Sequence, residues 1–251
     1  MKLLNRLTII IIVLQLLMAC DSSSAPECFR TAGNAVTYDI AVPDFTNIHT
    51  SPGIELVITE GRPQRVTVHT GENLTEYIKA EVTDGELLLT NANNCNWTRD
   101  YNTTTVYIAT PNLEKIYSAS QFAVKSNGVL TFPSLTLQSG LFSETASGTF
   151  ELDLAVDNLL IEDDQSTYYE LKGTVNNLNI KLYDGDARFE ASQLVAQNIE
   201  VFQRSTNDII VNPQQEIRGT IYSTGNVVLK NEPPVVSIEQ LYTGRLVYDV
   251  D

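Results

Sequence analysis

The segment NLLIEDDQSTYYELKGTVNNLNIKLYDGDARFEASQLVAQNIEVFQ, which runs from Asn158 to Gln203, repeats one short pattern. An apolar–x–apolar run is followed by a polar corner and then by a second short apolar run, and the first runs begin at Leu159, Leu178 and Ile199. Units of about 20 residues are too small to bury their own apolar side chains. The pattern therefore predicts units that stack like rungs and share one continuous core.

The same pattern extends in both directions from this segment. First runs also begin at Leu113, Leu135 and Ile217, so that successive starts are 22, 24, 19, 21 and 18 residues apart. Gly, Asn and Asp tolerate the left-handed backbone of sharp corners, and short polar side chains satisfy local backbone groups. Such residues recur in the corners 118–120, 139–140, 163–166, 184–186, 205–208 and 223–225.

These repeats predict an all-β fold, a parallel β-helix. Its inward positions are expected to include Leu137, Ile161, Ile180 and Val201, each above the last. The alternative is a β-sandwich, which also has short strands separated by frequent turns. The similarity between whole units favours the β-helix.

Residues 27–110 are predicted to form shorter, less regular β-strands before the regular rungs of residues 111–251. Apolar residues alternate with polar ones there, which is the period of a half-buried strand. Asp84-Gly85 predicts a hairpin, because such a turn requires positive φ and Gly supplies it without a Cβ clash. Residues 73–77 are long enough for a single helical turn.

The N-terminus has the features of a secretory signal with a lipoprotein box. Two early cations precede an apolar run that is too short to span a membrane, and LMAC occupies positions 17–20. We expect residues 1–19 to be a signal peptide, Cys20 to carry lipid, residues 20–26 to form a tether and residues 27–251 to form a single domain. Ordinary cleavage that leaves Cys20 as a free thiol is the alternative. The predicted location is the cell envelope, at the outer membrane, on either its periplasmic or its surface face.

Charge and cysteine content fit this location. The mature chain would carry 14 Lys and Arg against 31 Asp and Glu, a surface that repels nucleic acid. Because disulfides persist in an oxidising envelope, Cys28 and Cys95 are expected to pair, with two separate thiols as the alternative.

Carboxylates crowd the corners of successive units. Stacking would bring them onto one edge, where oxygen-rich clusters suit Ca²⁺ and paired carboxylates suit glycoside hydrolysis. Because charged corner residues are usually solvated, we expect no more than a weak cation or ligand edge. The residues concerned are Glu162, Asp163, Asp164, Asp184, Asp186 and Asp208.

No other constellation predicts catalysis, a metal site or a cofactor. The two histidines, His49 and His69, have no Cys or third His left to complete a metal site. Recurrent aromatic residues in a solenoid usually lie in or beside the core, which is the interpretation we favour. An exposed ladder that stacks on sugar rings is the alternative for Tyr168, Tyr169, Tyr183, Phe202 and Tyr222.

Several short segments follow one another in a distinctive order along nearly all of the mature chain. They are Glu27–Arg30, Phe45-x-x-Ile48, Ile54–Ile58, Asn73-Leu74, Gly85–Leu87, Asn94–Arg99, Gly225–Val228, Glu232–Pro234 and Thr243–Arg245. In this order they resemble the autotransporter adhesin head GIN domain family, found in many Bacteroidetes lipoproteins. The resemblance implies a right-handed parallel β-helix and a role in adhesion, with no catalytic residues. The chain differs from that family in having fewer Ser-Gly corners and more carboxylates.

Two functions from different classes remain open. The first is a non-catalytic, lipid-anchored envelope protein that binds an extracellular glycan or a surface protein along one side of the β-helix. The second is a β-helix enzyme that acts on a polysaccharide through its corner carboxylates, since fold alone does not choose between them. We expect binding, because the corner acids have few adjacent cations besides Lys181, Arg188 and Arg204.

Overall fold

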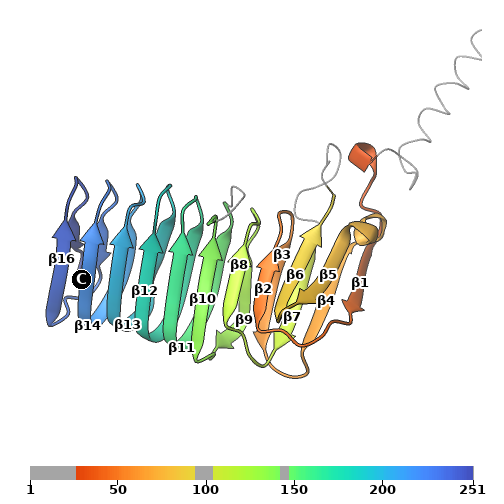
Figure 1. Ribbon diagram of the computed structural model, residues 1–251, viewed down its shortest axis with the longest axis horizontal. Helices are drawn as coiled ribbons and strands as arrows, with labels where there is room; N and C mark the ends of the chain where they lie inside the picture. The colour runs from red at the N-terminus through yellow and green to blue at the C-terminus, as the bar shows by residue number, and fades with distance from the viewer. Residues whose placement is uncertain (1–26, 94–103, 142–146, 251) are drawn as a thin grey trace, which may run out of the picture.

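The computed structural model describes residues 27–93, 104–141 and 147–250. The 17 strands within these residues belong to one sheet, which winds into a β-solenoid (Figure 1). Successive rungs pair in parallel, for example β10 (Ser134–Ser139) with β11 (Thr149–Asp163). The prediction of an all-β parallel β-helix is confirmed, and the sandwich alternative is wrong.

The wound sheet has two flat sides, which we call the front side and the back side. The front side contains β6 (Glu86–Asn91), β2 (Asn47–Thr50), β8 (Lys115–Ser118), β10, the second halves of β11, β12 (Tyr168–Leu182), β13 (Arg188–Gln203) and β14 (Ile209–Ile221), and β16 (Val235–Gln240). The back side contains β7 (Thr105–Thr110), β3 (Glu55–Glu60), β9 (Val124–Leu130), the first halves of β11–β14, β15 (Val227–Leu229) and β17 (Leu246–Tyr248). Corners that lead from the front side to the back side form the upper edge of the solenoid in Figure 1.

The regular rungs contain longer strands than the sequence pattern predicts. The second short run of one unit and the first run of the next join into single strands of 15, 15, 16 and 13 residues, β11–β14. The chain bends within these strands and needs no loop there. Gly173, in the middle of β12, has φ 109° and lies against the Leu154 carbonyl, where a Cβ would collide.

The core is a series of rows that run along the solenoid axis. Leu137 pairs in register with Ile161, Ile161 with Ile180, and Ile180 with Val201, and all four are at most 2% exposed. The predicted inward register is therefore confirmed.

The N-terminal part departs from a simple stack in its strand order. β2 pairs in parallel with both β6 and β8, and β3 pairs with both β7 and β9, so the rung of β6 and β7 lies outside the rung that precedes it in the chain. Antiparallel strands β1 (Ala35–Ile40), β4 (Arg65–Gly71) and β5 (Ile78–Thr83) then continue the sheet at this end. The predicted hairpin is confirmed, with φ 51° at Asp84 and φ 77° at Gly85.

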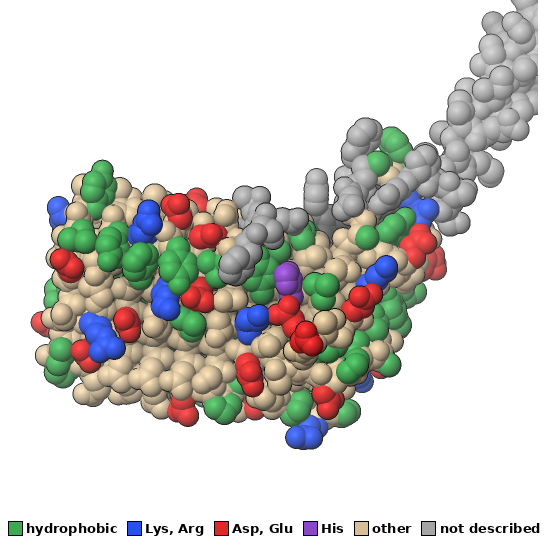
Figure 2. All heavy atoms as spheres, viewed as in Figure 1, with side chains coloured by type: hydrophobic (Ala, Val, Ile, Leu, Met, Phe, Trp, Pro, Cys, Tyr) green, Lys and Arg blue, Asp and Glu red, His purple; other side chains and the backbone are tan. Residues whose placement is uncertain are grey.

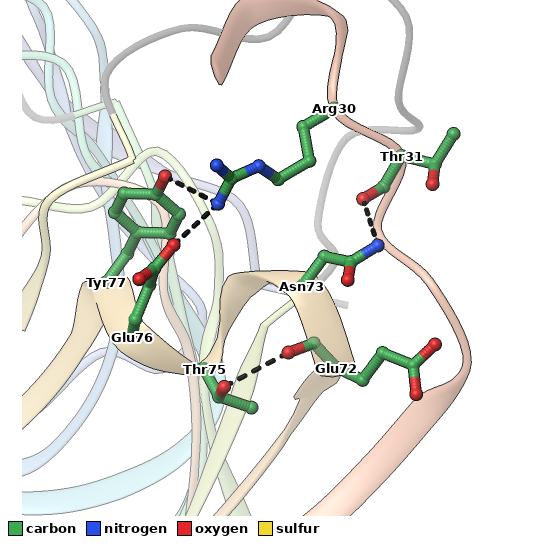
Figure 3. A network of polar contacts seen from close by, with 7 residues as sticks. All are labelled: Arg30, Thr31, Glu72, Asn73, Thr75, Glu76 and Tyr77. Carbon is green, nitrogen blue, oxygen red and sulfur yellow. Dashed lines mark hydrogen bonds and ion pairs between the residues drawn. The ribbon is translucent and has the colours of Figure 1, made fainter. Parts of the chain in front are cut away.

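Side-chain contacts hold the first described residues against this end (Figure 3). After η2 (Glu27–Phe29), Arg30 donates to the carboxylate of Glu76 at 2.5 Å and to the hydroxyl of Tyr77 at 3.0 Å. Asn73 donates to the backbone carbonyl of Thr31 at 3.1 Å. Three of these partners lie in the 3-10 helix η3 (Glu72–Tyr77), which covers the residues that the sequence left open as a single helical turn. The chain thus enters at one end of the solenoid and its last strands lie at the other (Figure 1).

Candidate ligand-binding surface

Side chains on the front side form rows because the rungs are in register. Along one row the outward positions are Gln138, Glu162, Lys181, Phe202 and Thr220, each paired with the next. A neighbouring row begins where the strands end. Backbone hydrogen bonds continue the register there, because the amides of the residues after β12, β13 and β14 each donate to the preceding rung at 2.7–2.9 Å.

Three aromatic side chains from successive rungs meet where these two rows adjoin. The ring of Phe202 lies 5.8 Å from that of Tyr183 and 4.7 Å from that of Tyr222, at tilts of 51° and 38°. Neighbouring strands are about 4.8 Å apart, so stacked rungs bring outward rings within contact distance. We call Tyr183, Phe202 and Tyr222 the outer aromatic row. Tyr222 is 41% exposed, and the other two are partly exposed.

Hydrophobic side chains form a visible band on this side of the molecule. Figure 2 shows them gathered across the front side, below the upper edge, with Lys and Arg side chains beside them. The band runs along the solenoid axis and crosses several rungs. Its direction favours an elongated ligand that lies across successive rungs.

Polar groups border the outer aromatic row. Glu162 accepts hydrogen bonds from the Tyr183 hydroxyl and from the Gln138 amide, both at 2.7 Å. The ammonium of Lys181 lies 3.8 Å from the same carboxylate. Burial, followed by the hydrogen bond to Glu162, raises the pKa of Tyr183 to about 12. The phenol is therefore a neutral donor at every physiological pH.

A second polar feature lies on the same side, near the lower edge. Asn177 donates to Asn158 at 3.1 Å, and Asn198 donates to Asn177 at 3.2 Å, which gives a ladder of amides across three rungs. A groove of about 350 Å³ lies beside this ladder. It is lined by Asn177, Leu178, Asn179, Asn198, Ile199, Glu200, Glu216 and Arg218.

Chemically, this side can bind a hydroxyl-rich ligand. Aromatic faces accept the apolar face of a flat ring, and planar carboxylate and amide groups exchange hydrogen bonds with hydroxyls. The Glu162 carboxylate and the Gln138 amide supply such groups beside the rings. Sequence reasoning missed the pairing of Glu162 with Gln138, which the alternation of outward positions at Gln138, Glu162 and Phe202 could have indicated.

The predicted carboxylate edge is only partly assembled, and the prediction that Asp163 is solvated is wrong. Its side chain is 0% exposed and accepts hydrogen bonds from the Tyr169 hydroxyl at 2.8 Å and the Gln165 amide at 2.7 Å. Burial raises the pKa of Asp163 to about 6, although these hydrogen bonds oppose the shift. Tyr169 is also in the core, where burial raises its pKa well above 10.

The other corner carboxylates lie nearer to solvent. Asp184 and Asp186 are exposed, whereas Asp164 and Asp208 are partly buried, and Asp208 accepts from the backbone and side chain of Asn226. Across residues 27–93, 104–141 and 147–250, no group of three Asp, Glu, His or Cys residues is arranged to hold a metal ion. The weak cation edge therefore stays a prediction without a formed site.

The remaining predicted residues are distributed as follows. Tyr168 lies on the back side under the Arg188 guanidinium, 5.7 Å from the ring centre. His49 packs 4.5 Å from the Tyr117 ring, where burial lowers its pKa, and His69 contacts the Thr37 hydroxyl at 2.9 Å.

Several sequence predictions concern residues whose structure is not described. The signal peptide, Cys20 and the tether precede residue 27, and Cys95 lies between residues 93 and 104. Lipidation and the Cys28–Cys95 disulfide stay predictions. Within the described part of the chain, no helix is long and apolar enough to cross a membrane.

Comparisons with known proteins agree with the fold. The model of the family described as "Putative auto-transporter adhesin, head GIN domain" matches residues 44–233. A putative adhesin from Bacteroides fragilis is similar in structure, with a TM-score of 0.76, 19% identity, and coverage of 87% of this chain and 99% of that one. No curated protein matches the chain.

Two structures from Parabacteroides are similar as well. A putative lipid binding protein from Parabacteroides distasonis has a TM-score of 0.63 and 20% identity, covering 86% of this chain and 97% of its own. A putative adhesin from Parabacteroides merdae has a TM-score of 0.64 and 15% identity, covering 86% and 96%. At these identities the likeness concerns the fold.

Proposed function

We propose that this chain, which belongs to the auto-transporter adhesin head GIN domain family, is an envelope adhesin that binds a glycan on the front side of its solenoid. The observation that carries the proposal is the outer aromatic row, three surface rings held by successive rungs at 5.8 and 4.7 Å. A solvent-facing row adds little to core packing, whereas it matches the flat faces of consecutive sugars.

The polar border supports a sugar over a purely apolar ligand. Glu162 and Gln138 present a carboxylate and an amide beside the rings, and Lys181 adds an ammonium. Each of these groups can exchange its present partner for a sugar hydroxyl, because all are partly exposed. Lipid binding, the property named for the Parabacteroides distasonis relative, has less support on this side, where polar groups flank the aromatic rings.

Enzymatic cleavage has less support than binding. A carboxyl that serves as a general acid needs a raised pKa and contact with the substrate. Asp163 has the raised pKa, but its side chain is 0% exposed and bonded to Tyr169 inside the core. The corner acids Asp184 and Asp186 are exposed, outside any enclosed cleft formed by the lining residues of the described grooves.

The proposed anchor suits this geometry. Lipid on Cys20 would attach the chain at the end where Arg30 contacts η3, and the regular rungs would then project away from the membrane (Figure 1). The front side would remain accessible along its length. Stable anchoring needs more than one acyl chain, as in lipoproteins that carry several.

Binding is tested with the lipid-free mature chain on a glycan panel, followed by titration of the strongest ligand. We expect Tyr222→Ala to weaken binding about tenfold, since stacking on an aromatic ring contributes roughly 0.5–1.5 kcal/mol beyond its buried area. Tyr107→Ala is the matched control, because Tyr107 is an exposed tyrosine on the back side. Equal affinity of the parent and Tyr222→Ala for every ligand would show that the row is not the site.

The anchor is tested separately by cell fractionation. Cys20→Ser should move the protein from the membrane fraction to the soluble fraction, because it removes the acylated thiol. A variant that stays in the membrane fraction as fully as the parent would show that Cys20 is not the anchor.

A further inference from the structure

Cations are scarce on this protein, and several of them are already paired with carboxylates. The chain has a formal net charge of −15, with 16 Lys and Arg against 31 Asp and Glu. Seven of these cations lie within 4.0 Å of a carboxylate: Arg30, Lys115, Lys125, Lys172, Lys181, Arg218 and Lys230. Only a cation outside these pairs can pair with a ligand carboxylate without first giving up a partner.

Arg204 is such a cation, and it lies beside the outer aromatic row. Its backbone amide donates to the Leu182 carbonyl at 2.9 Å, and the amide of Tyr222 donates to the Gln203 carbonyl at 2.7 Å. These bonds place Arg204 between Tyr183 and Tyr222 along the solenoid axis. The side chain is exposed, and among the described residues it makes no ion pair.

We propose that the outer aromatic row selects a glycan with an acidic sugar, whose carboxylate pairs with Arg204. This proposal rests on the glycan-binding function proposed above. A guanidinium matches a carboxylate with two parallel hydrogen bonds, and its charge strengthens both. The flanking rings of Tyr183 and Tyr222 would hold the sugar ring in place while the carboxylate faces the arginine.

The surrounding charges favour a ligand with isolated carboxylates over a dense polyanion. Glu162 lies beside the row, and Asp184 is exposed in the corner that follows Tyr183. Both repel further negative charge within a Debye length of about 8 Å at physiological salt. The row crosses three rungs, roughly 10 Å at the strand spacing, which suits a segment of two or three sugars.

The test compares acidic oligosaccharides with their own methyl esters, which keep the sugar and remove the charge. Oligosaccharides that end in glucuronate, galacturonate or sialate are titrated into the lipid-free mature chain. The parent should bind at least one acid about tenfold more tightly than its ester, the usual scale for a hydrogen bond to a charged group. Arg204→Gln should abolish this difference by lowering the affinity for the acid.

Arg188→Gln is the matched control for overall charge, because Arg188 is exposed on the back side over Tyr168. It should preserve the preference for the acid. Equal binding of acid and ester by the parent, or equal loss of preference in both arginine variants, would overturn the role of Arg204.

The outcomes separate this inference from the proposed function. Suppose that neutral glycans bind in a Tyr222-dependent way and acids are not preferred. This result would support the proposed binding site and reject only the pairing of a ligand carboxylate with Arg204. Acid binding that depends on Arg204 but not on Tyr222 would instead show that the outer aromatic row is not the binding site. It would therefore overturn this inference as well.

Discussion

Two aromatic rows run along this solenoid, one inside and one outside. In the inner row, the ring of Tyr169 lies 5.1 Å from that of Phe150 and 5.8 Å from that of Phe189. In the outer aromatic row the two separations are 5.8 and 4.7 Å. The inner rings are at most 1% exposed, whereas Tyr222 is 41% exposed. Rung stacking thus sets the spacing of both rows, and the side of the strand decides whether a row packs in the core or faces solvent.

The largest expected effect is a loss of stability when a ring of the inner row is removed. Phe189→Ala should lower the free energy of unfolding by about 3–5 kcal/mol, because it leaves a cavity among buried residues. Phe202→Ala, a matched change in the same strand, should cost about 1 kcal/mol or less, as partly exposed positions usually do. Denaturant unfolding measures both. Similar losses of unfolding free energy in the two variants would contradict the claim that the inner row stabilises the fold more than the outer row does.

Asp163, which bonds to the inner row, should make stability depend on pH. Its pKa is about 6 in the folded chain and about 3.8 without burial, so the folded state holds the proton more tightly. Protonated Asp163 therefore adds to the free energy of unfolding. This stabilisation grows as pH falls from 6 toward 3.8 and is lost as pH rises through 6. The gain between pH 7 and pH 5 should be about 1 kcal/mol.

Asp163→Asn isolates this contribution, since the amide keeps a donor and an acceptor without a charge. From pH 7 to pH 5 the parent should gain about 1 kcal/mol of unfolding free energy relative to the variant, which has no carboxyl to protonate at this position. A pH-independent difference would show that the buried carboxyl does not titrate in this range.

The smallest expected effect concerns the outer row alone. Glu162→Gln removes the carboxylate that accepts from Tyr183, so the pKa of this phenol should fall from about 12 while remaining above 10, because burial is the larger cause. The titration of Tyr183 is read from ultraviolet difference spectra against Tyr183→Phe. An unchanged pKa would mean that the contact does not form in solution.

Side chains along a strand alternate between inward and outward positions, and this alternation, which we call strand parity, explains which features could be predicted from the sequence. The inward row from Leu137 to Val201 could be predicted because alternation within a strand and repetition between units are both local patterns. The same parity places Asp163, two residues after Ile161, in the core and places Phe202 and Glu162 outside. The expectation that Asp163 is solvated follows from the usual exposure of charged corner residues. In this strand the alternation of inward and outward positions outweighs that tendency.

Other features depend on contacts that local patterns do not encode. The rung of β6 and β7 lies outside β2 and β3, since the parallel partners of β2 are 39 and 68 residues away along the chain. The outer aromatic row required the register between rungs of unequal length, which unit spacings of 19, 21 and 18 residues leave open. The sequence shows its residues as recurrent aromatics, and the surface position given there as the alternative is the one that these three residues adopt.

The most direct test of the account is where a bound glycan touches the protein. With the strongest ligand from the panel, nuclear Overhauser contacts are measured between sugar protons and aromatic ring protons. We expect contacts to Tyr183, Phe202 and Tyr222 and none to Tyr107 on the back side. Contacts to other residues, with none to the outer aromatic row, would contradict the claim that this row is the binding surface.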